Sequence, residues 1–190
     1  MRRRRDGTAS RWSGGLRLAV VGGAAALVVA GVTGWYPYAQ LSPHVPAVTL
    51  RPGAEAELAG VRYRLERFEV APTLPAKDPK DPPAQGPPGS LLVLVVVSQT
   101  VLDRSVALDE HYCDATLTED DGATVWQTDS DFTTLAARPA SFGCAGTEES
   151  PLRYDVAHET GFSFVVPAAA AGHLSARMAV RDGPTVAFEP

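Results

Sequence analysis

"GSLLVLVVVSQT", residues 89–100, contains an uninterrupted run of seven apolar residues at 91–97. A helix of this length would be only about 10 Å long, which is far too short to cross a bilayer. A Pro-Pro-Gly sequence precedes the run, polar residues follow it, and four of its seven residues are valine, whose branched side chain suits a pleated strand. A short apolar run between turn signals is typical of a strand buried on both faces. We therefore predict that residues 91–97 form the central strand of a sheet.

Segments of alternating polarity surround this run, as expected of strands with one buried face. In the first of them a phase slip at Glu66 and Arg67 indicates a β-bulge. Asp-Gly pairs at 121–122 and 182–183 lie between alternating segments and are strong hairpin signals. These patterns predict an all-β fold, an antiparallel sandwich of about seven to nine strands over residues 54–190. The alternating segments lie at 61–70, 113–118, 162–166, 174–180 and 186–188.

Two proline-containing segments lie beside the predicted strands. Residues 71–89 hold seven prolines and few large apolar side chains, which predicts a solvated loop, partly in polyproline II conformation. Residues 36–53 contain further prolines and are predicted to form a short, stiff stalk that precedes the sandwich.

The charge of the chain is unevenly distributed. Six of its 17 basic residues lie within residues 1–17, whereas the remainder carries 11 basic and 21 acidic residues. A body with this excess of negative charge would repel a phosphate backbone, so we do not expect nucleic acid as a partner.

An uncharged apolar segment at 18–35 follows the basic cluster. As a helix it would span roughly 27 Å, close to the thickness of the hydrocarbon layer. The positive-inside rule then predicts a single-pass protein of the cytoplasmic membrane, with a basic cytoplasmic tail at 1–17 and the sandwich outside. Aromatic residues that suit the membrane interface flank the segment: Trp12 on one side, and Trp35, Tyr36 and Tyr38 on the other.

Two features of this segment leave alternatives open. Cleavage as a signal peptide would release a secreted protein, although the apolar core is longer than is usual for such peptides. Small residues recur at four-residue spacing and form a candidate helix-pairing stripe, which would make a homodimer; an anchor merely rich in alanine and glycine is the simpler interpretation. The stripe consists of Gly22, Ala26, Ala30 and Gly34.

The two cysteines, Cys113 and Cys144, both lie in the part predicted to be outside the cytoplasm. In an oxidising compartment a disulfide is the default, and closing a loop of this length would stabilise the domain by roughly 3 to 4 kcal/mol. A reactive thiol with His111 or His158 as its base is the alternative. The spacing of these residues gives that alternative no support.

The sequence contains no complete motif for a metal or for catalysis. His111, Cys113 and Asp114 are close in sequence but lack a further ligand, and a disulfide-bonded cysteine supplies no thiolate. The segment HETGF at 158–162 lacks the second histidine of a zinc-protease helix, and GFSFV at 161–165 lacks the last glycine of a nucleophile elbow. We therefore predict a protein that is not an enzyme, with no metal and no cofactor.

The order of these segments resembles the small immunoglobulin-like extracytoplasmic domains of bacterial lipoproteins and anchored secreted proteins, a family of unknown function. It is also similar to the sandwiches of mycobacterial secreted antigens. The resemblance covers about residues 55–188 and implies a fold and a compartment, with no catalytic residues. Gln99 and Thr100 stand where the family commonly ends its long strand with Asn. The resemblance is carried by the segments VRYRLERFEV, LLVLVVVSQTVLDRSVAL, CDATLTEDDGATVW, LSARMAVRDG and HETGFSFVVPAAA, the last with Gly161, Phe162, Phe164 and Pro167.

The expected function is non-catalytic binding of another envelope protein or of a cell-wall component, through loops or edge strands. One alternative is a ligand sensor or enzyme with a site in residues 128–157, near Trp126, Phe132, Phe142 and Tyr154. Another is a structural subunit of a membrane complex. A concave pocket with clustered polar side chains would favour the ligand sensor or enzyme, and a flat, loop-rich surface with an apolar patch would favour the binding module.

Overall fold

The computed structural model describes residues 45–76, 80–119, 124–129, 143–148 and 150–190. The predicted tail 1–17, the anchor 18–35, its interface aromatics and the pairing stripe lie outside the described residues. Within the described ranges, no helix combines the length and the apolar character that a membrane crossing requires.

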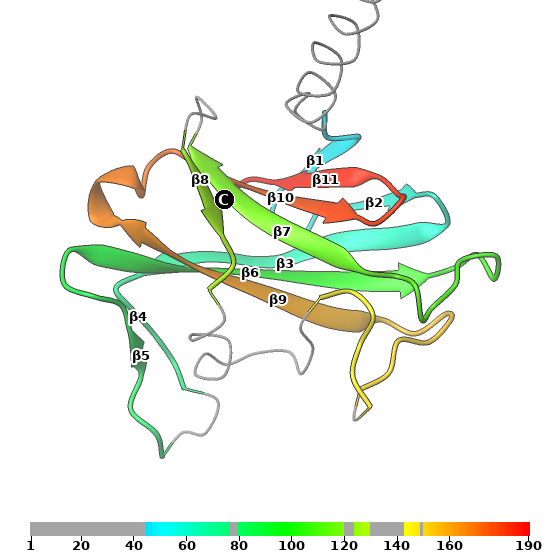
Figure 1. Ribbon diagram of the computed structural model, residues 1–190, viewed down its shortest axis with the longest axis horizontal. Coiled ribbons are helices and arrows are strands. Elements are labelled where there is room, and N and C mark those ends of the chain that lie inside the picture. The colour runs from blue at the N-terminus through cyan, green and yellow to red at the C-terminus, as the bar shows by residue number, and fades with distance from the viewer. Residues whose placement is uncertain (1–44, 77–79, 120–123, 130–142, 149) are drawn as a thin grey trace, which may run out of the picture. The chain divides into compact units, whose positions relative to one another are not determined.

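The described residues form two facing sheets, one of four and one of five strands (Figure 1). The four-stranded sheet has the order β2-β3-β6-β9, and all of its pairs are antiparallel. The five-stranded sheet has the order β1-β11-β10-β7-β8. The bounds in the first sheet are Glu55–Leu58 (β2), Val61–Ala71 (β3), Ser90–Val101 (β6) and His158–Pro167 (β9). Those in the second are Val48–Leu50 (β1), Cys113–Glu119 (β7), Val125–Gln127 (β8), Leu174–Val180 (β10) and Thr185–Phe188 (β11).

The core lies between the two sheets and is built from the alternating residues of each strand. Val93, Val95 and Val97 of β6 are fully buried there, next to Phe164 of β9. The five-stranded sheet contributes buried residues from β7, β10 and β11 to the same cluster, namely Ala115, Leu117, Ala176, Met178, Val186 and Phe188. The predicted all-β sandwich is therefore confirmed.

The other face of β6 is also buried, which explains why its apolar run is continuous. A two-stranded ribbon, β4 (Thr73–Leu74) and β5 (Ala84–Gln85), supplies its cover. The prediction of a solvated loop at 71–89 is wrong for Leu74 and Ala84, which are buried, whereas Thr73 and Gln85 are exposed. The reason is that an apolar outer face needs a partner, and the loop contains the apolar side chains that provide it. The second cluster consists of Leu74, Ala84, Leu92, Leu94 and Val96.

The turns and the bulge follow the sequence signals. The register of β3 against β6 shifts between Leu65 and Arg67, as the phase slip predicts. The β10–β11 hairpin turns at Asp182, whose φ is 55°, and Gly183. The β7–β8 hairpin is also present, although its Asp-Gly turn lies outside the described residues.

Two expectations about the start of the sandwich are wrong. Strand β1 pairs in parallel with β11, so the sandwich is not wholly antiparallel and begins before residue 54. The predicted stalk at 36–53 therefore includes a strand, whose Leu50 is buried in the core. The strand has three residues, Val48–Leu50, which are too few to show an alternating pattern. With β1 and the ribbon, the described residues hold eleven strands, nine of them in the two sheets.

Candidate functional site

The predicted disulfide joins Cys113, at the start of β7, to Cys144, with 5.3 Å between the two Cα atoms. Both cysteines are buried in the core. The prediction is confirmed, and neither residue supplies a thiolate to a metal or a substrate. The bond fixes the segment that precedes β9 against one end of the five-stranded sheet.

A row of polar side chains crosses the four-stranded sheet at this end of the core. Tyr63 of β3 pairs with Gln99 of β6, and Gln99 pairs with His158 of β9. Residues directly opposite each other share a face, so all three side chains lie on the inner face of the sheet. All three are buried, Tyr63 and Gln99 with no exposed surface.

Gln99 fixes the orientation of His111, which lies in the loop between β6 and β7. The Nε2 of Gln99 donates to the carbonyl oxygen of Cys144 at 2.6 Å. Its Oε1 is therefore left to accept from His111, whose Nε2 lies 3.2 Å away. The neutral His111 ring consequently carries its proton on Nε2 and presents Nδ1 as an acceptor.

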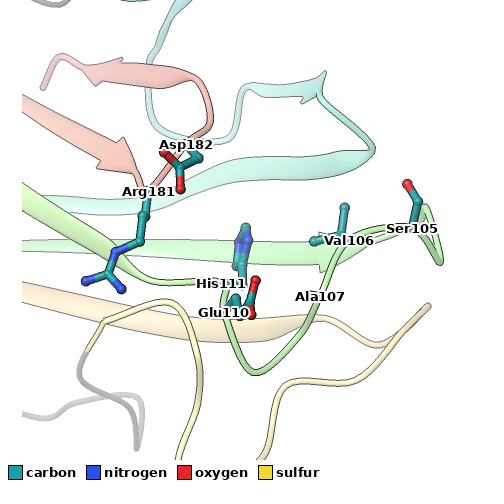
Figure 2. A pocket seen from close by; sticks show the side chains of 7 residues that line it. All are labelled: Ser105, Val106, Ala107, Glu110, His111, Arg181 and Asp182. Carbon is teal, nitrogen blue, oxygen red and sulfur yellow. The ribbon is translucent and has the colours of Figure 1, made fainter.

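An open cleft of about 620 Å³ lies beside His111. One wall is the loop 102–112, and the other is the β10–β11 turn (Figure 2). The side chains around it are mostly polar and carry both signs of charge. The lining includes Ser105, Val106, Glu110, His111, Arg181 and Asp182.

A second, smaller hollow of about 130 Å³ shares part of its lining with this cleft. His111, Val106 and the β10–β11 turn line both spaces, and Tyr63 is among the residues around the smaller one. Within the described part of the chain, the hydroxyl of Tyr63 is buried without a hydrogen-bond partner. Buried polar groups almost always have partners, so this hydroxyl is an exception within the core.

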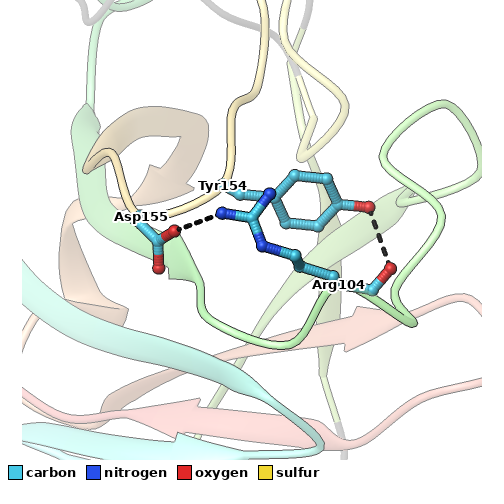
Figure 3. Close-up of polar contacts among 3 residues, drawn as sticks. All are labelled: Arg104, Tyr154 and Asp155. Carbon is cyan, nitrogen blue, oxygen red and sulfur yellow. Dashed lines mark hydrogen bonds and ion pairs between the residues drawn. The ribbon is translucent and has the colours of Figure 1, made fainter.

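Tyr154 and Asp155 hold the outer wall of the cleft, the loop 102–112, in place (Figure 3). Its hydroxyl donates to the carbonyl oxygen of Val106 at 2.7 Å and lies 3.3 Å from that of Arg104. The Arg104 guanidinium lies over the Tyr154 ring and forms a 3.1 Å ion pair with Asp155. Because both charged groups are well exposed, the pair contributes little stability, and its main effect is on the shape of the loop.

The loop 102–112 is further shaped by local hydrogen bonds. The Asp103 carboxylate accepts from the backbone N–H of Ser105 at 2.8 Å, and this bond lowers the pKa of the carboxyl group. The N–H groups of Leu102 and Asp103 both donate to the carbonyl of Gly60, in the β2–β3 turn. Gly60 has a φ of 76°, and a side chain there would overlap Asp103, so this contact requires glycine.

The interior of the site is uncharged near neutral pH. Burial lowers the pKa of the His111 imidazole. It also lowers the pKa of His158, although the neighbouring Glu159 opposes this shift. Burial raises the pKa of the Tyr63 hydroxyl. Among the described residues there is no group of three or more potential metal ligands.

These shifts predict that acid weakens the fold through His111. An unfolded imidazole takes up a proton near its ordinary pKa of about 6.5, whereas the buried ring resists protonation. The free energy of unfolding should therefore be fully retained above pH 6.5 and fall as the pH drops from there through the lowered pKa. Urea unfolding at pH 7.5 and 5.5 measures this drop, and His111→Gln should reduce it.

The matched control is His173→Gln, at an exposed position. It should lose as much stability between the two pH values as the unmodified protein does. His158 contributes to the drop in the same direction, so some of it should remain in His111→Gln. If the free energy of unfolding fell equally between pH 7.5 and 5.5 in His111→Gln and in the unmodified protein, the acid sensitivity would not come from His111.

Of the region 128–157, considered as an alternative site, the structure describes residues 128, 129, 143–148 and 150–157. Tyr154 braces the cleft wall, and Trp126 packs against the core. Phe132 and Phe142 lie outside the described residues. Of the metal candidates, His111 lies at the cleft, while Asp114 is exposed on the outer side of its strand and Cys113 is bonded to Cys144.

Sequence reasoning missed Gln99 and Tyr63 as site residues. Gln99 continues the phase of Val93, Val95 and Val97, so a polar residue on the buried face was visible in the sequence. Nothing in the sequence indicates that the Tyr63 hydroxyl lacks a partner, because that depends on the loop packed above it.

No protein-family model matches the chain. No curated protein matches it either. The similar solved structures include an uncharacterized β-sandwich protein from Clostridium difficile 630, 10% identical, covering 74% of this chain and 91% of its own, with a TM-score of 0.45. A conserved hypothetical protein from Bacillus anthracis is 6% identical over 72% of this chain and 94% of its own, with a TM-score of 0.47. The yjhA protein from Bacillus subtilis is 6% identical over 74% of this chain and 99% of its own, with a TM-score of 0.45.

Proposed function

We propose that this chain is a membrane-anchored, extracytoplasmic and non-catalytic binding domain of immunoglobulin-like topology. Its binding site is the cleft between the loop 102–112 and the β10–β11 turn, and its ligand is a component of the cell envelope. The observation that carries the proposal is the cleft itself: about 620 Å³ in volume, polar, and built from two segments that the sandwich holds in place.

The order of the strands supports the immunoglobulin-like topology. Strands β3, β6 and β9 pair as the A, B and E strands of that fold do, and β11, β10, β7 and β8 follow its order G, F, C and C′. The parallel strand β1 lies beside β11, at the free edge of this sheet. Two differences are that the described residues include no counterpart of strand D, and that the disulfide does not join the B and F strands.

Two features support a location outside the cytoplasm. The basic residues before the apolar segment 18–35 predict that the sandwich lies on the far side of the membrane. A buried disulfide persists in an oxidising compartment and is rare in the cytosol. The proposal retains the helix-pairing stripe in this segment as a route to a homodimer.

The mixed charge of the cleft supports the binding of a polar envelope component. Arg181 supplies a cation, and Glu110 and Asp182 supply anions at the same opening. Such an arrangement offers donors and acceptors to a ligand without a large net charge. The exposed large apolar side chains among the described residues are few, and Tyr112 is the one that adjoins the cleft lining.

Photocrosslinking in intact cells tests this proposal. A photoreactive residue replaces Ser105, which is exposed at the cleft, in the full-length protein. The matched control places it at Gln85, which is exposed on the β4–β5 ribbon. We expect an adduct from position 105 that is absent from position 85, and its digestion by a protease or by a wall hydrolase identifies its class.

Two results would overturn the assignment of the cleft. Equal adducts from both positions would show that the cleft has no preference over other exposed surface. Recovery of only copies of this chain from position 105 would favour a structural subunit over a ligand-binding domain.

A further inference from the structure

We propose that a hollow on the outer face of the five-stranded sheet, here called the outer hollow, binds a zwitterionic α-amino acid. The ligand carboxylate would lie against Arg177 and its ammonium group against Glu119, both of which line the outer hollow. The volume is about 210 Å³, the lining comes mainly from strands β1, β7, β10 and β11, and no lining residue is shared with the cleft. The inference therefore goes beyond the proposed function and can fail without it.

The outer hollow arises where two small side chains lie on neighbouring strands. Arg177 of β10 pairs with Ala187 of β11, and Ser175 of β10 pairs with Thr118 of β7. These residues alternate along β10 with the core residue Met178, so their side chains lie on the outer face of the sheet. Because Ala187 and Ser175 are small, they leave a depression between their larger neighbours.

Of the three charged residues that line the outer hollow, one already has a partner. Glu189 forms a 3.2 Å ion pair with Arg51. Within the part of the chain that the structure describes, the side chains of Arg177 and Glu119 form no hydrogen bond or ion pair. The outer hollow therefore holds one cation and one anion that remain unpaired.

The register of β10 against β7 keeps these two charges apart. Arg177 lies opposite Thr116, which precedes Glu119 by three positions in the same strand. At about 3.4 Å per residue, the two backbones are separated by about 10 Å along the strand direction. Both charges are consequently available to a ligand that fills the space between them.

The guanidinium of Arg177 suits a carboxylate. Its Nε is buried without a partner, whereas the residue as a whole is only partly buried. The accessible part of the group is therefore the pair of terminal nitrogens, which can donate in parallel to the two oxygens of a carboxylate. The hydroxyls of Thr49 and Ser175 lie in the same lining and supply further hydrogen-bonding groups.

A ligand with a single charge suits the outer hollow less well. An anion alone would be repelled by Glu119 and Glu189, and a cation alone would be repelled by Arg177. An α-amino acid carries an ammonium group and a carboxylate on the same carbon atom, so it can pair with both unpaired residues at once. These ion pairs stay in contact with water, so we expect weak binding.

The test uses the full-length oxidised protein in lipid nanodiscs, in a buffer free of amines and carboxylates. Saturation-transfer NMR measures the binding of L-alanine, with acetate and methylammonium as the probes that carry only one of its charges. We expect roughly millimolar binding of alanine and at least tenfold weaker binding of each single-charge probe.

Two substitutions locate the binding site. Arg177→Gln should weaken alanine binding by about tenfold or more, the value of a hydrogen bond to a charged group. Glu119→Gln should reduce the preference for alanine over acetate. The matched control is Arg62→Gln, which removes an exposed arginine that pairs with Glu57 on the four-stranded sheet and should leave alanine binding unchanged.

The thermal unfolding midpoint separates binding from folding. Because the Arg177 side chain forms no polar contact within the described residues, Arg177→Gln should leave this midpoint nearly unchanged. Three results contradict the inference: no binding of alanine, binding of acetate as tight as that of alanine, or equal alanine binding by Arg177→Gln and the unmodified protein. None of them bears on the cleft, whose test is the crosslink from position 105.

Discussion

Replacing both Cys113 and Cys144 by alanine should lower the free energy of unfolding by about 3 to 4 kcal/mol. The bond closes a loop with a sequence separation of 31 residues, and its loss restores freedom to the unfolded chain. The folded state loses as well, because the disulfide tethers the segment whose backbone carbonyl at residue 144 accepts from Gln99, which in turn orients His111. Denaturant unfolding of the variant and of the oxidised protein measures the difference.

Two controls accompany this measurement. Reduction of the unmodified protein should destabilise it by about the same amount as the double substitution. Val156→Ala, at an exposed position, should change the free energy of unfolding by less than about 0.5 kcal/mol. A double variant as stable as the oxidised protein would show that the disulfide does not hold the fold together.

Leu94→Ala should destabilise the protein by about 2 to 5 kcal/mol. Leu94 points away from the space between the sheets, yet only 1% of it is exposed because the β4–β5 ribbon covers it. Its truncation removes buried apolar surface and leaves a cavity beneath Leu74. The change in the free energy of unfolding, measured by denaturant titration, reports whether this outer face is covered.

Val125→Ala is the control for this substitution, since Val125 lies on an edge strand and is 52% exposed. It should have little effect. A change below about 0.5 kcal/mol for Leu94→Ala as well would mean that the outer face of β6 is solvated and that the ribbon does not pack on it.

The strands were predictable where local pattern and burial agree. The continuous apolar run of β6 reflects two covered faces, and the alternation in β7 and β10 reflects one. The bulge in β3 appears in the sequence as a change of phase, because one extra residue moves the side chains that follow it to the opposite face of the strand. The disulfide was predictable because the chain has only two cysteines.

The parts that were not predictable depend on pairing between distant segments. Strand β1 is three residues long and exists because β11 offers it a partner 138 positions further on, as between Val48 and Val186. The ribbon over β6 rests on Leu74 and Ala84, which are inconspicuous among prolines. The cleft is built from loops, whose side chains follow no periodic pattern. Among the residues that support it, only Gln99 could be recognised from the sequence, because it continues the alternation of buried residues along β6.

Amide hydrogen exchange in the full-length oxidised protein tests the central claim most directly, namely that residues 91–97 form a strand buried on both faces between β3 and β9. Amides in such a strand exchange only when the whole domain unfolds. The account predicts that these seven residues exchange among the slowest in the sandwich, far more slowly than the loop 102–112. Exchange at 91–97 as fast as in that loop would contradict the fold and, with it, the cleft that the fold supports.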